Sequence, residues 1–242
     1  DFIYPGDPLT PGWSSKPGCK RIPQADALSL PKIMSVPLSA QDALILLEVI
    51  GGEEAPEEWK GALPVNYRLG GTEAHIQMKV KMKAPITKIT NVIGCIKGTD
   101  SKEGIVLVGN HRDAWVFGGH DPSSGTACLM ELARVLAEAK KADYKLKRTV
   151  YFASWDAEEF TLTGSTEWGE DNREWLKENL IAYLNVDSAA SGRNFNVQAV
   201  PSLSRLITQA LREVNDPASG EPVYNSWKKA PQERGTIAVA SG

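Results

Sequence analysis

One histidine and five acidic residues stand where predicted strands end or just before a predicted helix. They are His111, Asp113, Asp121, Glu158, Glu159 and Asp187. The strands that precede them are the apolar runs at 105–108, 149–153 and 181–186. Because the carboxyl ends of parallel strands meet at one edge of a sheet, we expect these side chains to lie close together.

The residue types in this group fit a metal-dependent hydrolase. A cluster of carboxylates repels itself unless protons or cations neutralise it. A pair of divalent metal ions does this well, and a mixture of imidazole and carboxylate ligands suits zinc. One aspartate can bridge two metals about 3.5–4 Å apart with its two oxygens. A glutamate beside them can take a proton from a metal-bound water, which then attacks a peptide bond.

Some members of the group have separable roles, and each also has a plainer explanation. Asp113 lies two residues beyond His111 and could hold the second nitrogen of its imidazole. Of the neighbours Glu158 and Glu159, one could bind metal while the other handles the proton of the water. Taken alone, a Glu-Glu pair at a helix start complements the helix dipole, and Asp121 before a proline is an ordinary turn and cap. Their joint placement at one sheet edge favours a site.

The elements that must position this group follow one another regularly from about residue 86. Strands are expected at 91–96, 105–108, 149–153 and 181–187, and helices at 124–139, 164–179 and 201–214. Strands with continuous apolar sequences are typically buried on both faces, and their alternation with helices favours an α/β fold with a largely parallel sheet.

The residues before about position 86 and those after position 215 lack this alternation of apolar strands and helices. Residues 1–38 are rich in Pro and Gly and are expected to be loop, after which Ser39 caps a helix that runs to Ile50. Apolar and polar side chains alternate over 76–82, which predicts a strand with one exposed face. Residues 216–242 contain no clear element, and a domain seldom ends on such a stretch, so we expect a segment of a longer protein.

Composition narrows the function classes. The chain has 242 residues, of which 42% are hydrophobic and 24% charged, and its net charge is −3. This is enough apolar material for a large core, and it excludes a disordered or fibrous protein. A mildly acidic chain is not expected to bind nucleic acid by bulk electrostatics. Three cysteines without a CxxC pair are too few for a disulfide scaffold.

Four ordered motifs resemble those of the glutamate carboxypeptidase II family, which includes prostate-specific membrane antigen, the N-acetylated-alpha-linked acidic dipeptidases and the transferrin receptors. The motifs are NHRDAWVFGGHDPSSG at 110–125, FASWDAEEF at 152–160, GSTEW at 164–168 and AYLNVD at 182–187. The opening YPGDPLTPG at 4–12 is also similar, so the resemblance runs over essentially the whole chain.

The resemblance implies a three-layer α/β zinc-peptidase core of the aminopeptidase type with a mostly parallel central sheet. Residues 1–85 would be the C-terminal part of an inserted protease-associated domain. Residues 86–242 would be the zinc peptidase domain, incomplete at its C-terminus.

The resemblance also assigns roles to individual residues. His111 and Asp187 would hold one zinc ion, Glu159 the other, and Asp121 would bridge the two. Glu158 would be the general base, and Asp113 would orient His111. These six assignments are carried over position by position from the motifs of the family.

Two further sets of residues match the family pattern. A structural calcium ion would be held by Thr10, Trp13, Glu167 and Glu170. Glu167 and Glu170 are three residues apart, so a helix places them on the same face. The plainer alternative is that this face is exposed to solvent and binds no ion. Substrate contacts would come from Thr161, which stands where the family usually has glycine, and from Ser241 and Gly242.

The function that the resemblance implies is that of a zinc-dependent exopeptidase of the glutamate carboxypeptidase type, acting on small peptides. The alternative is a catalytically inactive, transferrin-receptor-like binding domain. The receptor branch has lost metal-binding positions, so this alternative is disfavoured by the presence of His111, Asp121, Glu158, Glu159 and Asp187. The remaining zinc ligand of the family is a histidine beyond this chain, so the isolated segment is expected to be inactive. By resemblance, the full-length protein is expected to be a homodimer formed through a further C-terminal domain. It is also expected to be a single-pass membrane protein facing the lumen or the exterior.

Overall fold

The structure is a computed structural model of the chain and describes residues 4–71, 75–190, 192, 195–229 and 238–239. The chain divides into two compact units, each described by itself. One contains Asp1–Tyr4 and Lys20–Lys88, and the other contains Pro5–Cys19 together with Ile89–Gly242. The boundary expected between residues 85 and 86 stays a prediction, as does the assignment of a protease-associated domain.

In its described residues, the unit that contains Lys20–Lys88 is mostly irregular and carries one α-helix, α1 (Ala40–Val49). The Ser39 hydroxyl accepts a hydrogen bond from the backbone nitrogen of Asp42 at 3.1 Å, which confirms the expected cap. Single 3-10 turns occur at Gln24–Asp26 and Glu57–Trp59.

The strand expected over 76–82 is wrong. The structure assigns no strand to the described residues of this region, and Ile76 and Met82 are 64% and 79% exposed. Alternation of apolar and polar residues gives a strand only where a neighbouring strand pairs with its backbone groups. In the described part of the chain, no strand lies beside this segment.

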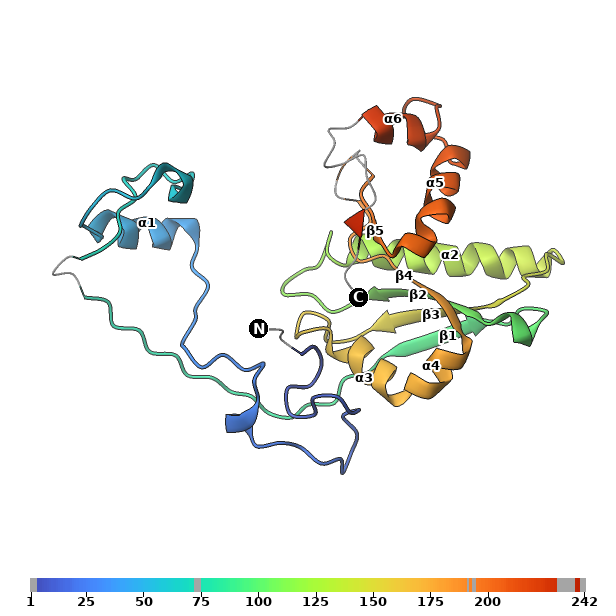
Figure 1. Cartoon of the computed structure of the whole chain (residues 1–242), viewed down its shortest axis with the longest axis horizontal. Coiled ribbons are helices and arrows are strands. Elements are labelled where there is room, and N and C mark those ends of the chain that lie inside the picture. The colour runs from blue at the N-terminus through green and yellow to red at the C-terminus, as the bar shows by residue number, and fades with distance from the viewer. Residues whose placement is uncertain (1–3, 72–74, 191, 193–194, 230–237, 240–242) are drawn as a thin grey trace. The chain divides into compact units, whose positions relative to one another are not determined.

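A four-stranded sheet forms the centre of the other unit (Figure 1). Its strands are β1 (Val92–Ile96), β2 (Ile105–His111), β3 (Thr149–Trp155) and β4 (Leu180–Asn185). In the spatial order β1-β3-β2-β4, β2 is parallel to both β3 and β4, whereas β1 is antiparallel to β3. The mostly parallel α/β sheet is therefore confirmed, with an antiparallel strand at one edge.

Helices cover both faces of this sheet. Helix α2 (Ser123–Lys141) lies along one face, where its Leu129 packs with Val108 and Phe152 in a buried cluster (Figure 1). Helices α3 (Thr163–Asp171) and α4 (Arg173–Asn179) lie on the other face. There, Trp168 packs on Trp155 with the ring centroids 5.4 Å apart. The result is a three-layer arrangement, and the single helix expected over 164–179 is two helices.

The chain continues beyond the sheet with two packed helices, α5 (Ser204–Glu213) and α6 (Val223–Lys229). Leu211 of α5 and Trp227 of α6 are both buried. Two short strands, β5 (Gln198–Ala199) and β6 (Ala238–Val239), pair in parallel. The expectation that 216–242 contains no element is therefore wrong for α6 and β6.

None of the helices in the described ranges is both long and apolar enough to cross a membrane. Cys19, Cys95 and Cys128 are all free thiols.

Candidate metal centre

The acidic residues and the histidine meet at the carboxyl edge of the parallel strands, as the sequence predicts. His111 is the last residue of β2 and lies opposite Trp155, the last residue of β3. Asp187 follows the end of β4 by two residues, and Asp121 lies in the loop that leads from β2 to α2. Three separate segments of chain therefore bring side chains to one point.

His111 is the buried centre of this group, with its side chain only 2% exposed. Its Nε2 lies 3.0 Å from Asp121 Oδ1 and 3.0 Å from Asp187 Oδ1. Its Nδ1 lies 3.0 Å from the backbone carbonyl oxygen of Asp113. Because a carbonyl oxygen can only accept a hydrogen bond, Nδ1 carries the proton in the neutral ring, and the Nε2 lone pair is left for a metal ion.

The donor atoms fit zinc in kind and in spacing. His111, Asp121 and Glu159 each offer one ligand atom, and these three atoms all lie within 4.8 Å of one another. Two ligands of one tetrahedral zinc lie roughly 3.3 Å apart, because each is about 2.0–2.1 Å from the metal. The 3.0 Å separations between His111 Nε2 and the two aspartates are close to that spacing. Imidazole nitrogen with carboxylate oxygen is also a donor set that zinc prefers.

The Asp113 carboxylate fastens the loop that follows β3. Its Oδ1 accepts a hydrogen bond from the backbone nitrogen of Glu158 at 2.9 Å, and its Oδ2 accepts one from that of Glu159 at 3.2 Å. Asp113 Oδ1 also lies 3.6 Å from His111 Nδ1. Asp113 thus contacts the ring mainly through its main chain, while its carboxylate positions the segment that carries both glutamates.

Glu158 lies close to the histidine, with its Oε2 3.9 Å from His111 Nδ1. Partial burial raises the pKa of Glu158 above its usual value, and the negative charges of Asp187, Glu159 and Asp113 act in the same direction, while His111 opposes them. A carboxylate whose pKa is raised toward neutrality accepts and returns protons more readily near pH 7. A raised pKa is compatible with a general base, and that role of Glu158 stays a prediction.

The acidic surroundings also act on His111. Burial is the largest single influence and disfavours the charged ring, but the hydrogen bond and charge of Asp187, with the charges of Glu158 and Asp121, outweigh it. The pKa of His111 is therefore raised above its usual value. A positive charge at this point is favoured, and a bound cation meets the same preference.

The chain after the glutamates takes an unusual backbone conformation. Thr161 and Leu162 have φ angles of 66° and 57°, in the left-handed region that residues other than glycine adopt uncommonly and β-branched ones such as threonine least of all. The resemblance expects glycine at position 161, and glycine adopts this conformation without strain. The Thr161 hydroxyl oxygen lies 2.6 Å from the Phe160 carbonyl oxygen and 3.2 Å from that of Gly6, and the Gly6 nitrogen donates to the Thr161 carbonyl at 2.7 Å. A substrate contact by Thr161 stays a prediction, and Ser241 and Gly242 lie outside the described residues.

Glu167 joins the segment Pro5–Cys19 to helix α3 within the unit that contains the sheet. Its side chain accepts hydrogen bonds from the backbone nitrogens of Asp7 at 2.7 Å and Ser15 at 2.5 Å. Burial is the main reason that the pKa of Glu167 is raised. The close approach depends on Gly6, because a Cβ there would lie 2.8 Å from Glu167 Oε1.

The residues implied for calcium come from this same contact. Thr10 is fully buried, and its Oγ1 has no hydrogen-bond partner among the residues that the structure describes. The Trp13 nitrogen donates to the Thr10 carbonyl at 3.2 Å, and Glu170 lies one turn along α3 from Glu167. Carboxylate and carbonyl oxygens are the ligands that calcium prefers, and Glu167 supplies a buried carboxylate here. A calcium ion held by these residues stays a prediction.

Sequence reasoning missed Asn110, which is fully buried in β2 directly before His111. Its amide nitrogen lies 2.9 Å from the Val186 carbonyl oxygen, and its Oδ1 accepts a hydrogen bond from the Thr126 hydroxyl at 2.6 Å. The signal was available: an amide inside an otherwise apolar strand must find hydrogen-bond partners.

Tyr183 of β4 was also missed. Its hydroxyl accepts a hydrogen bond from Trp155 Nε1 at 2.8 Å and donates one to Asn185 Oδ1 at 2.9 Å. Burial raises the pKa of Tyr183 to about 12, and the charges of Asp187 and Glu158 contribute. The hydroxyl therefore stays protonated at physiological pH and serves as a fixed hydrogen-bonding group beneath the acidic edge.

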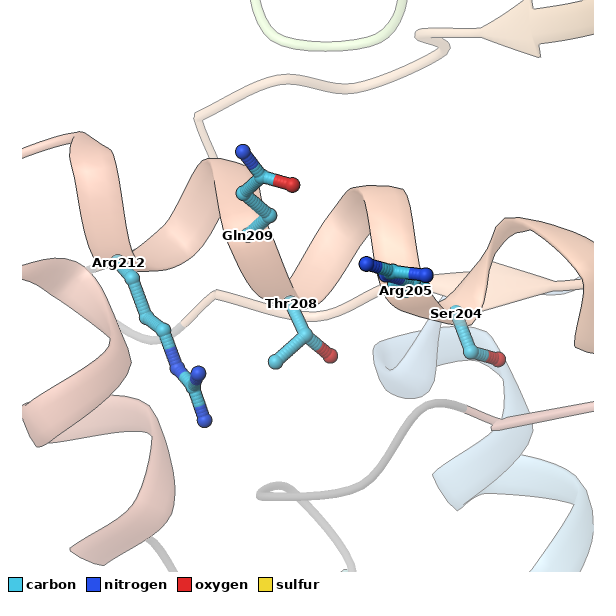
Figure 2. Close-up of a pocket in the computed structure, with 5 residues that line it drawn as sticks. All are labelled: Ser204, Arg205, Thr208, Gln209 and Arg212. Atoms are coloured by element: carbon cyan, nitrogen blue, oxygen red, sulfur yellow. The ribbon is translucent and has the colours of Figure 1, made fainter.

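A separate cavity lies along α5 and shares no residue with the metal group. Five side chains of this helix line it: Ser204, Arg205, Thr208, Gln209 and Arg212 (Figure 2). The Arg212 guanidinium lies over the Tyr224 ring, 4.6 Å from its centroid. Among the described residues that line the cavity, none has a carboxylate or imidazole that could bind zinc.

Comparison with known proteins gives a consistent family. A model of peptidase family M28 matches residues 91–232. A probable glutamate carboxypeptidase of Arabidopsis thaliana, LAMP1, is 44% identical over 92% of this chain and 32% of its own length. The aminopeptidase NAALADL1 of Rattus norvegicus is 38% identical over 93% of this chain and 32% of its own length. The chain thus spans about a third of the length of these curated relatives.

Solved structures that match part of this chain include the LapA aminopeptidase of Legionella pneumophila, with a TM-score of 0.43 and 22% identity. That match covers 62% of this chain and 43% of the other. A peptidase M28 precursor of Shewanella amazonensis matches with a TM-score of 0.42 and 22% identity, over 63% of this chain and 31% of the other.

Proposed function

This chain belongs to peptidase family M28. We propose that it forms part of a peptidase and that the full-length protein is a zinc-dependent exopeptidase of the glutamate carboxypeptidase type. The observation that carries the proposal is the convergence of His111, Asp121 and Glu159, whose ligand atoms lie within 4.8 Å of one another. Glu158, a carboxylate with a raised pKa, adjoins this group.

The proposed ligand arrangement uses two zinc ions. His111 and Asp187 would hold one ion, Glu159 would hold the other, and Asp121 would serve as a ligand shared by the two. The 3.0 Å distances from His111 Nε2 to Asp121 and to Asp187 support their sharing a metal ion with the histidine. Zinc bound at such a site lowers the pKa of a bound water to about 7 and polarises the carbonyl of a substrate.

The chain's own residues provide proton transfer and orientation. Glu158 takes the proton of the attacking water at a side-chain oxygen and returns it to the leaving amine. Its raised pKa supports this role, because the proton must be both accepted and released near neutral pH. Asp113 holds the backbone of Glu158 and Glu159 in place through the hydrogen bonds at 2.9 and 3.2 Å.

The proposed substrate is a small peptide from which one terminal residue is removed. Some relatives are named glutamate carboxypeptidase and others aminopeptidase. Both names describe exopeptidases, which remove a residue from one end of a peptide. We favour the carboxypeptidase because the plant relatives with that name are 44% and 40% identical. A structural calcium ion held near Thr10 and Glu167 is part of the proposal, as are a homodimer and a membrane anchor, which rest on the family resemblance.

The test is a hydrolysis assay on the purified full-length protein. After removal of metal with a chelator, the protein is returned to zinc and offered two dipeptides ending in glutamate, one with an acylated and one with a free amino terminus. We expect zinc-dependent release of the C-terminal glutamate, mainly from the acylated dipeptide. Cleavage of the free dipeptide alone would favour an aminopeptidase. The absence of zinc-dependent hydrolysis of either, and of a panel of unblocked peptides, would contradict the proposal.

A further inference from the structure

Asn110 connects the two segments that carry the aspartates of the metal centre. Its amide nitrogen lies 2.9 Å from the carbonyl oxygen of Val186 and 3.2 Å from that of Asp187. The same nitrogen lies 3.4 Å from the carbonyl oxygen of Pro122, the residue after Asp121. One buried amide thus reaches the backbone on both sides of the histidine.

The Asn110 side chain is itself held in one orientation. The Thr126 hydroxyl, in the first turn of α2, donates to Asn110 Oδ1 at 2.6 Å. The three backbone carbonyl oxygens can only accept hydrogen bonds, so they identify the atom facing them as the amide nitrogen and leave Oδ1 to the Thr126 hydroxyl. Because Asn110 is fully buried, loss of these partners would leave polar groups unsatisfied rather than hydrated.

Close packing at Gly125 confirms that the backbone after β4 is pressed against α2. A Cβ at Gly125 would lie 2.0 Å from the Asp187 carbonyl oxygen, 2.1 Å from that of Val186 and 2.6 Å from Asn110 Nδ2. No side chain fits in this space. The Asp187 backbone is therefore confined between the start of α2 and the Asn110 amide.

We propose that Asn110 is a positioning residue of the metal centre, which sets the distance between the Asp121 and Asp187 carboxylates across the Nε2 of His111. The inference rests on the proposed function, because it concerns the same zinc site. Asn110 contacts no metal ligand atom and acts through the backbone of residues 122, 186 and 187. Both aspartates lie 3.0 Å from His111 Nε2, so a small displacement of either segment changes the spacing that zinc requires.

The decisive measurement is the zinc dissociation constant of the full-length protein and its variants, by competition with a chelator of known affinity. Asn110→Ala removes the amide and is expected to weaken zinc binding by about 10–100-fold, the usual effect of losing a group that orients metal ligands. Thr126→Val removes only the hydroxyl that orients the amide, so a smaller loss in the same direction is expected. It also keeps the test valid if Asn110→Ala does not fold.

Leu129→Ala is the matched control for loss of stability. Leu129 is a residue of α2 whose buried side chain packs against the sheet, and it does not belong to the metal group. Its truncation should lower the melting temperature of the metal-free protein but leave the zinc dissociation constant unchanged.

The outcomes separate this inference from the proposed function. If the unmutated protein binds zinc and the Asn110 and Thr126 variants bind it equally well, Asn110 has a structural role only and the inference is wrong. The same holds if Leu129→Ala weakens zinc binding as much as they do. If the unmutated protein binds no zinc, the proposed function fails as well.

Discussion

The Asp113 carboxylate accepts a hydrogen bond from the backbone nitrogen of Glu158, with 2.9 Å between Asp113 Oδ1 and that nitrogen. The two residues are 45 positions apart, at the ends of neighbouring parallel strands. Asp113 also orients His111, because its backbone carbonyl oxygen lies 3.0 Å from Nδ1 of the ring. One residue therefore sets the relation between a metal ligand and the general base of the proposed mechanism.

Asp113→Asn should lower kcat by about 10–100-fold while the zinc content stays near that of the unmutated protein. The amide retains one acceptor oxygen, but its N–H₂ group would face a backbone N–H that now bonds to the carboxylate. The backbone carbonyl that contacts His111 is unchanged. Steady-state kinetics and elemental analysis on the same preparation check this. Loss of zinc with no separate loss of kcat per zinc would show that Asp113 acts on the metal instead.

The neighbours Glu158 and Glu159 should differ in what their substitution removes. Glu158→Gln cannot accept the proton of the water, so kcat should fall by at least about 10²-fold with zinc retained. Glu159→Gln removes a charged ligand and should reduce zinc affinity. Zinc content and kcat are measured for both variants. The assignment of roles is reversed if Glu158→Gln is the variant that loses zinc.

The stability of the metal-free protein should fall as the pH rises past neutrality. The pKa of His111 is raised in the folded state, so the folded protein binds that proton more tightly than the unfolded chain does. The resulting stabilisation is complete below the unfolded pKa of about 6.5 and is lost as the pH rises through the folded pKa. The raised pKa of Glu158 contributes with the same sign, at lower pH.

Thermal unfolding in the presence of a chelator, between pH 6 and pH 9, measures this dependence. His111→Gln should flatten the decline, whereas His75→Gln, at an exposed residue outside the site, should leave it unchanged. If the stability of His111→Gln declined as steeply with pH, a group other than His111 would be responsible for the pH dependence.

Calcium should stabilise the protein through Glu167. A ligand at about a hundred times its dissociation constant adds about 2.7 kcal/mol to the free energy of unfolding. The melting temperature of the unmutated protein should rise with added calcium, and Glu167→Gln should lose this response. Glu174→Gln is the control, because Glu174 is an exposed residue of α4 that pairs with Lys177 at 2.9 Å. A calcium response that survives in Glu167→Gln would remove the calcium site from the proposal.

The sequence predicted those parts of the fold in which a local residue pattern is compatible with only one kind of secondary structure. Apolar runs bounded by turns gave β2, β3 and β4, and the rule for parallel strands then placed His111 and Asp187 at one edge. The antiparallel direction of β1 was not predicted, because an apolar run has the same appearance in either direction.

Other features depended on partners that the sequence does not name. The alternating pattern over 76–82 lacks a neighbouring strand in the described part of the chain. The short β6 exists because it pairs with β5, and the roles of Asn110 and Tyr183 depend on carbonyl and side-chain partners that only the folded chain brings close. Local pattern thus predicts which elements form, while tertiary contacts decide how single polar residues are used.

The most direct test of the account is the zinc content of the purified full-length protein, beside the same protein with Asp121→Asn. Asp143→Asn is the control, because Asp143 is an exposed aspartate that pairs with Lys145 outside the site. We predict about two zinc ions per chain in the unmutated protein and in Asp143→Asn, and a loss of zinc in Asp121→Asn because the bridging carboxylate is gone. An unmutated protein that contains no zinc would contradict the metal centre, and with it the enzyme, and would favour a receptor-like binding domain.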